Sequence, residues 1–146
     1  MLFRSEYLPI APEEVSEKTE KIVKHIEKEN KLKKVFIALE NDKIVGFIGI
    51  KRVHFARLRH VAKLMIGVLD DYKKQGIGTK LMEYVENWAK ENEIKRLELT
   101  VVEDNDPAVE FFEEMDFDKE GTREKAIKIK GEYLDEIFMA KAIDED

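Results

Sequence analysis

The chain has 146 residues, enough for one domain with its own core, and it is 43% hydrophobic, 40% charged and free of cysteine, with a formal net charge of −6. This composition excludes disulfides, cysteine-ligated zinc fingers and thiol nucleophiles, and it argues against broad binding to nucleic acid or to an anionic membrane. With neither an apolar run of membrane-spanning length nor a signal peptide in residues 1–10, we expect one cytoplasmic domain over residues 1–146, and the abundance of Lys and Glu suggests a thermostable protein from a heat-adapted source.

The first third of the chain predicts a helix followed by a β-hairpin. Pro12, with two acidic residues directly after it, is typical of a helix start, and apolar residues at helical spacing extend that helix over about residues 12–30. Apolar runs at 35–39 and 44–53 predict two strands that pair around a turn at Asn41-Asp42.

The middle of the chain predicts a strand, a helix and a second strand. The first strand, over residues 61–69, contains Gly67, which marks a bulge or a close backbone approach. A helix with apolar positions from Ile77 to Ala89 follows, and residues 94–102 form a nearly continuous apolar strand, which favours a central position covered on both faces. This βαβ unit predicts a right-handed crossover between parallel strands.

The end of the chain predicts a short helix and a second hairpin. Asp106-Pro107 begins a helix that ends near Met115, and strands over about 117–129 and 133–143 turn at Lys130-Gly131. With the earlier elements, they predict an α/β fold with a mixed, mostly antiparallel sheet around a central parallel crossover.

The segment before the central helix is typical of an anion-binding loop. It contains Lys73-Lys74-Gln75-Gly76-Ile77-Gly78-Thr79. Glycines let successive N–H groups point at one place, the start of the helix adds partial positive charge, and the lysines add full charges, so the loop suits a pyrophosphate. The spacing fits neither the ATP-type loop nor the dinucleotide pattern, whose third glycine would fall at Leu81. A plain strand-to-helix turn is the alternative.

These residues resemble the acetyl-CoA motif of the GNAT superfamily of N-acetyltransferases, Arg/Gln-x-x-Gly-x-Gly/Ala. Lys73 departs from that pattern by replacing Arg or Gln, which keeps charge but loses the planar fork. Residues 66–68 resemble the end of the family's fourth strand, residues 97–101 its fifth, and residues 105–117 its Asn-x-x-Ala segment, with Asp116 in place of the usual glycine. The resemblance implies a GNAT fold whose fourth and fifth strands splay apart, with a first strand shortened to within residues 2–10.

The same resemblance implies which residues bind acetyl-CoA, the expected cosubstrate. Main-chain groups of Ile66, Gly67 and Val68 would pair with the pantetheine arm, Gly67 forming a bulge that opens the gap or serving as a packing glycine. The N–H of Val68 would hold the oxyanion. Asn105 would contact the pantetheine amide or else cap the following helix. The pyrophosphate would lie on the loop formed by Lys73, Lys74, Gln75, Gly76, Ile77, Gly78 and Thr79.

The groups that would move protons are harder to identify. An ammonium acceptor with a pKa of ~10 must lose a proton before it attacks, so a base or a water chain is needed. Glu98 and Glu103 are the candidates, each with a solvated surface carboxylate as the alternative, and His54 and His60 are weaker ones. Phe112, placed at the cofactor by the resemblance, fills the position of the family's tyrosine acid and has no proton to donate.

The favoured function is therefore transfer of the acetyl group of acetyl-CoA to a primary amine, without a metal. The alternative is a CoA-binding or regulatory module without turnover, and a generic nucleotide-binding domain is a distant third. The acceptor is not identified, and a homodimer through the terminal strands or first helices stays open.

Overall fold

The computed structural model describes residues 33–40, 43–69 and 76–143. In order, these residues form β1 (Lys33–Glu40), β2 (Lys43–Arg52), the 3₁₀ turn η3 (Ala56–Leu58), β3 (Val61–Val68), α2 (Ile77–Glu91), β4 (Arg96–Val102), α3 (Asp106–Glu114), β5 (Asp118–Ile129) and β6 (Glu132–Ala142). The predicted helix at 12–30, the shortened strand at 2–10 and the turn at 41–42 lie outside the described residues.

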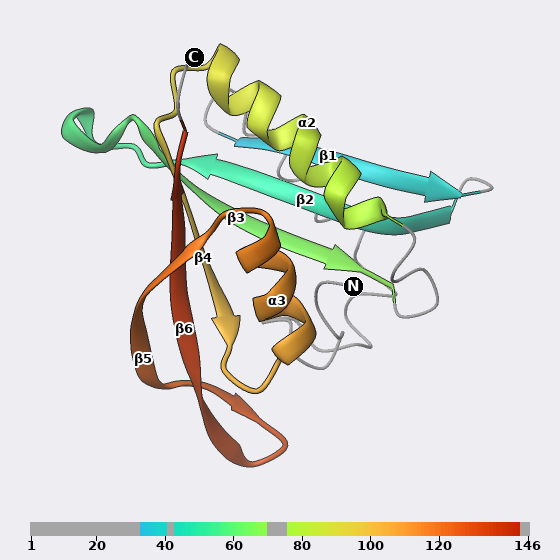
Figure 1. Ribbon diagram of the computed structural model, residues 1–146, viewed down its shortest axis with the longest axis vertical. Coiled ribbons are helices and arrows are strands. Elements are labelled where there is room, and N and C mark those ends of the chain that lie inside the picture. The colour runs from blue at the N-terminus through green and yellow to red at the C-terminus, as the bar shows by residue number, and fades with distance from the viewer. Residues whose placement is uncertain (1–32, 41–42, 70–75, 144–146) are drawn as a thin grey trace.

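The strands form one sheet in the order β1-β2-β3-β4-β6-β5. Only β3 and β4 run parallel, and every other neighbouring pair is antiparallel. Figure 1 shows α2 lying across β1, β2 and β3, with α3 beside β4 and the final hairpin. The prediction of an α/β fold with a mixed, mostly antiparallel sheet is confirmed.

The core lies between α2 and the sheet. Leu81, Val85 and Ala89 recur at helical spacing on the buried side of α2, and β2 turns alternate residues such as Ile48 and Ile50 to the same core. Burial of these side chains removes apolar surface from water, which is the main force that holds the helix on the sheet. The start of α2 is thereby held in place relative to β3.

β4 is central, as predicted. Leu97, Leu99 and Val101 are buried in the core, whereas the alternate residues Glu98 and Thr100 are half-buried. The prediction that β4 is covered on both faces stays a prediction, because residues 1–32 lie outside the described part of the chain.

The splay of the two parallel strands is confirmed. β3 and β4 pair at only three positions, the last being Lys63 with Glu98, and beyond it β3 pairs only with β2 and β4 only with β6. Figure 1 shows the two ribbons diverging beyond this point. A gap therefore opens in the middle of the sheet.

The predicted bulge at Gly67 is wrong. The register between β2 and β3 runs without a shift, and Gly67 lies directly opposite Phe47. A Cβ atom at Gly67 would lie 2.9 Å from Cε1 of Phe47. Gly67 is thus a packing glycine that makes room for an aromatic ring on the neighbouring strand, and the gap arises from the divergence of β4 instead.

Candidate active site

The main chain of β3 turns alternate residues toward the gap. The N–H of Val53 donates to the carbonyl of Val61 at 2.9 Å, and the N–H of Leu69 donates to the carbonyl of Val45 at 2.8 Å. Because hydrogen bonding alternates along an antiparallel pair, the odd-numbered residues of β3 bond to β2. The N–H and C=O groups of Ile66 and Val68 therefore point to the other side, where β4 has already diverged.

β4 lines the opposite side of the gap in the same way. The N–H of Ile143 donates to the carbonyl of Lys95 at 2.8 Å, and the N–H of Glu103 donates to the carbonyl of Asp135 at 3.0 Å. By the same alternation, the odd-numbered residues of β4 bond to β6. The main-chain groups of Thr100 and the N–H of Val102 therefore face the gap, whereas the carbonyl of Val102 accepts from the N–H of Asn105. Sequence reasoning did not name these two residues as backbone partners.

The gap thus has two facing rows of peptide groups that have no strand partner among the described residues. Such rows can bind an extended chain of alternating amides in the way that a sheet edge binds a strand. Of the three residues predicted for this role, Ile66 and Val68 are suitably oriented. Gly67 is not, because its main chain pairs with Phe47 on β2.

The start of α2 is the second part of the site. Gly76 adopts a left-handed conformation with φ of 79°, and Ile77, Gly78 and Thr79 form the first turn, which carries no acidic residue. The N–H groups of a first helical turn have no partner within the helix and favour an anion. Lys73, Lys74 and Gln75 lie outside the described residues.

Gly46 on β2, which the sequence analysis missed, brings these two parts together. A Cβ atom there would lie 3.2 Å from the carbonyl oxygen of Gly67 and 3.3 Å from side-chain atoms of Ile77 and Val68. Contacts of that length are tighter than most side chains tolerate. The glycine therefore lets the first residue of α2 sit against the end of β3, at the mouth of the gap.

Asn105 lies just beyond β4 and is buried, with 1% of its surface exposed. Its N–H donates to the carbonyl of Val102 at 2.9 Å, and its own carbonyl accepts from Ala108 and Val109. The residue stands at the N-cap of α3, but its side chain makes no capping hydrogen bond. The alternative role of side-chain cap is therefore wrong, and the predicted contact with the pantetheine amide stays a prediction.

Phe112 is a core residue. Its ring is completely buried and packs edge-on against Phe111 and Phe117, with ring centroids 5.4 and 5.8 Å apart. Such pairs add to the stability that comes from burial alone. Its predicted contact with the cofactor stays a prediction.

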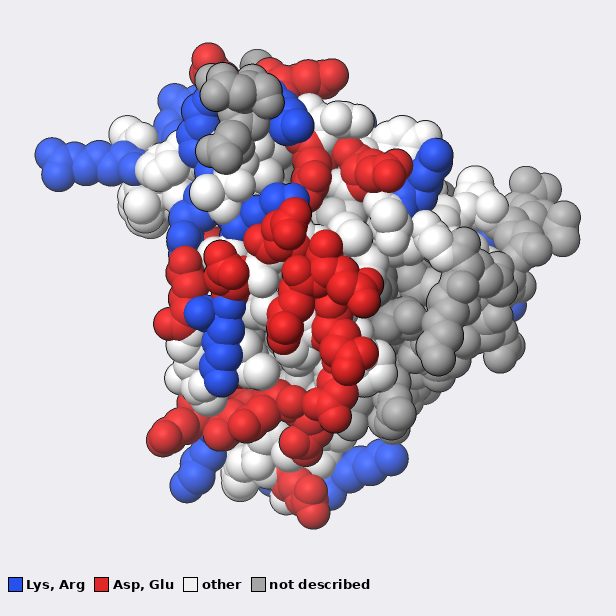
Figure 2. Space-filling model, in the orientation of Figure 1, with Lys and Arg blue, Asp and Glu red and all other residues white. Residues whose placement is uncertain are grey.

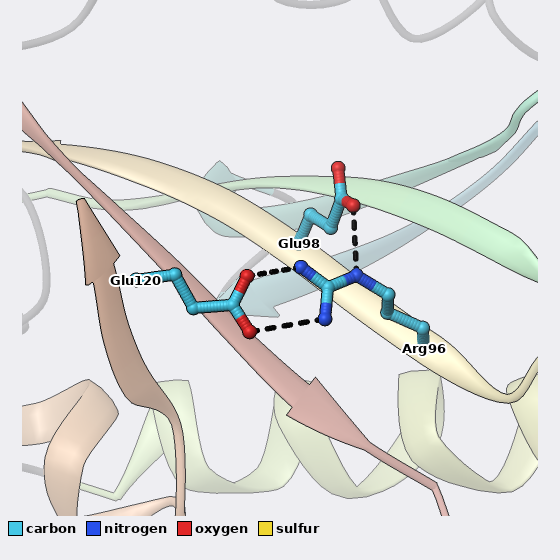
Figure 3. A network of polar contacts seen from close by, with 3 residues as sticks. All are labelled: Arg96, Glu98 and Glu120. Carbon is cyan, nitrogen blue, oxygen red and sulfur yellow. Dashed lines mark hydrogen bonds and ion pairs between the residues drawn. The ribbon is translucent and has the colours of Figure 1, made fainter. Parts of the chain in front are cut away.

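Glu98 belongs to a network of polar contacts that joins β4 to β5 (Figure 3). Arg96 Nε donates to Glu98 Oε1 at 2.9 Å, while the two other guanidinium nitrogens of Arg96 donate to both carboxylate oxygens of Glu120. The bond to Glu120, followed by that to Glu98, raises the pKa of Arg96, and the bond from Arg96 lowers the pKa of Glu120. Figure 3 shows the second oxygen of Glu98 pointing away from Arg96.

The other candidate bases are spread over the fold. Glu103 is exposed in the turn after β4. His54 and His60 are exposed at the beginning of β3, whereas α2 and the predicted oxyanion donor Val68 lie at its other end. The geometry thus keeps both histidines away from the mouth of the gap.

No helix among the described residues is long and apolar enough to cross a membrane. No group of three or more His, Asp or Glu side chains among them could hold a metal ion.

Comparison with known proteins matches this chain to acetyltransferases. The sequence pattern of the acetyltransferase (GNAT) family matches residues 2–117. The L-amino acid N-acetyltransferase AaaT of Escherichia coli (strain K12) is 33% identical over 114 residues, which cover 75% of this chain and 68% of that protein.

Solved structures share the fold. The acetyltransferase of the GNAT family from Streptococcus pneumoniae is 27% identical, with a TM-score of 0.80 over 94% of this chain and 84% of that one. An acetyltransferase from Salmonella typhimurium, solved with acetyl-CoA, is 18% identical and has a TM-score of 0.69 over 77% of this chain and 65% of that one.

Proposed function

The chain belongs to the acetyltransferase (GNAT) family, and we propose that it transfers the acetyl group of acetyl-CoA to a primary amine. The observation that carries this proposal is the gap between β3 and β4, with its facing rows of main-chain groups, next to the start of α2. A pantetheine arm contains amides that can bond to such rows, and a pyrophosphate suits the first turn of a helix. One cofactor would therefore occupy both parts of the site.

In the proposed reaction, the neutral amine attacks the carbonyl carbon of the thioester. The carbonyl oxygen becomes an oxyanion that accepts a hydrogen bond from the N–H of Val68, which points into the gap. The carbon–sulfur bond then breaks, CoA leaves as a thiolate, and the amine nitrogen gives up a proton. We assign that proton to the second oxygen of Glu98, which receives it through a chain of waters because Glu98 pairs with Lys63, five residues before Val68. Glu103 is the weaker candidate.

The surface beside the gap favours a positively charged acceptor. Between residues 103 and 118 the chain carries eight acidic side chains, all exposed, and no Lys or Arg. Figure 2 shows acidic side chains gathered over this part of the molecule. A negative surface raises the local concentration of a cation. Because the relative from Escherichia coli is named for L-amino acids, these are the first acceptors to test.

The test measures CoA release from acetyl-CoA with a panel of L-amino acids, polyamines and short peptides, together with CoA binding by calorimetry. The proposal predicts amine-dependent release of the thiol. Tight binding of CoA without release in any arm would favour the alternative, a CoA-binding module without turnover, for which the buried Phe112 at the place of the usual acid is the supporting observation.

The role of Val68 has a matched pair of variants. Val68→Pro removes an N–H that β2 does not use, so we expect kcat to fall by ~10²–10³-fold while CoA affinity changes by much less. Val68→Ala keeps the N–H and serves as the control. Equal kcat values for the two folded variants would exclude this N–H as the oxyanion donor.

A further inference from the structure

The β2–β3 hairpin differs in charge from the rest of the chain. Residues 43–69 contain six Lys and Arg residues and no Asp or Glu. The rest of the chain therefore carries 20 basic residues and all 32 acidic ones. The basic residues of the hairpin are Lys43, Lys51, Arg52, Arg57, Arg59 and Lys63. A local basic surface thus exists on a protein whose net charge is strongly negative.

The tip of this hairpin, residues 53–60, exposes two apolar side chains. Phe55 is 72% exposed and Leu58 is 46% exposed. The N–H of Leu58 donates to the carbonyl of Phe55 at 2.8 Å, which closes the 3₁₀ turn. This bond brings the main chain of the two residues together, so both exposed apolar side chains project from one tight turn.

The tip is also rich in arginine. Two of the six arginines of the chain, Arg57 and Arg59, lie in the tip and Arg52 directly precedes it, although Lys outnumbers Arg by 20 to six overall. Arg52 donates to the carbonyl of Asn92 and so fixes the base of the hairpin, whereas Arg57 and Arg59 are exposed. Arginine, unlike lysine, forms bidentate bonds to phosphate and stacks on flat rings.

The position of the tip separates it from the acetylation site. Figure 1 shows it projecting from the end of the sheet opposite the start of α2. A partner bound there would therefore leave the cofactor site open. The acidic residues 103–118 would repel a broad anionic surface that reached them, but a flexible anion can contact the tip alone.

We propose that residues 53–60 form a docking site for single-stranded nucleic acid. Phe55 stacks on a base, while Arg57 and Arg59 bind the neighbouring phosphates. An exposed aromatic ring followed by two exposed arginines fits this partner better than a bilayer, which would be served by a larger aliphatic surface than Leu58 alone offers. The net charge excludes broad binding of nucleic acid, but it does not exclude this local contact.

The test uses fluorescence anisotropy of the full chain with a fluorescein-labelled uridine oligonucleotide of about 12 nucleotides, a length within the usual site sizes. With two phosphate contacts, the logarithm of the association constant should fall with the logarithm of the salt concentration with a slope of about −1.4. R57Q/R59Q should bring that slope close to zero. The control K119Q/K125Q removes two exposed lysines from β5 and should leave it unchanged.

Phe55→Leu separates stacking from other kinds of apolar contact. It should weaken binding of the oligonucleotide by about fivefold or more and leave binding of inorganic polyphosphate unchanged. The proposal would be overturned if Phe55→Leu bound the oligonucleotide as tightly as the wild type, or if R57Q/R59Q kept the wild-type salt slope. It would also be overturned if the protein bound phosphatidylglycerol vesicles but not the oligonucleotide. All variants should keep the wild-type melting temperature and rate of acetyl transfer, so the result does not depend on the proposed acetyl acceptor.

Discussion

At the scale of single residues, the buried ring of Phe112 allows a test of whether this position assists the leaving group. Phe112→Tyr would place a hydroxyl among the rings of Phe111 and Phe117. Burial of a hydroxyl without a good partner costs about 1–3 kcal/mol. We expect the free energy of unfolding, measured with urea, to fall by that amount without a gain in the rate of acetyl transfer. A faster single-turnover reaction in the folded variant would instead place the hydroxyl at the sulfur.

Glu98, the proposed base, allows the second test at this scale. Glu98→Gln keeps an oxygen that can accept from Arg96 Nε, and Arg96 keeps both bonds to Glu120. The fold should therefore persist, while loss of the base lowers kcat by ~10²-fold. Glu103→Gln is the control, since that residue is exposed beyond the strand. A kcat equal to that of the wild type in the folded Glu98→Gln variant would exclude Glu98 as the base.

At the scale of elements, the start of α2 allows a test in which stability and binding change in opposite directions. Thr79→Glu places a carboxylate in a first turn that carries no acidic residue. This should stabilise the helix by about 0.3–1 kcal/mol and repel the pyrophosphate, so that CoA affinity falls at least tenfold, or about 1.4 kcal/mol. Thr79→Gln controls for size. Unchanged CoA affinity by calorimetry in Thr79→Glu would remove the first turn from the site.

The bridge between β4 and β5 predicts a dependence of stability on pH. Because the bond from Arg96 lowers the pKa of Glu120, the folded state favours the carboxylate. The stability that this gives is present above the unfolded pKa, near 4.5, and is lost as the pH falls through the lower folded pKa. The melting temperature of Glu120→Gln should therefore be lower than that of the wild type at pH 7 and equal to it at pH 2. A melting difference that persists at pH 2 would contradict this account.

The elements show why some features could be predicted and others could not. Alternating apolar residues indicated most of the strands, and the βαβ run indicated that β3 and β4 are parallel. The role of Gly67 could not be predicted, because it depends on Phe47 across the strand pair. The link from Arg96 to Glu120 spans 24 positions and passes between strands that are not neighbours, so no local pattern indicates it.

At the scale of the whole molecule, charge is divided between two regions. The acidic residues 103–118 follow β4, while the basic tip at 53–60 lies at the far end of the hairpin. A composition averaged over the chain hides this division, which is why the sequence analysis argued only from the net charge. The fold makes the division visible, since it determines which residues share a surface.

The short contact between β3 and β4 has a consequence for the mechanics of the sheet. The sheet consists of two three-stranded halves, β1-β2-β3 and β4-β6-β5, joined along three residue pairs. Such a seam can act as a hinge, and a molecule inserted beside it would brace the two halves against each other. The bound cosubstrate would then stabilise the sheet as well as react. The sheet would become more rigid when CoA binds and less rigid when it leaves, so amide hydrogen exchange along β3 and β4 would slow on CoA binding.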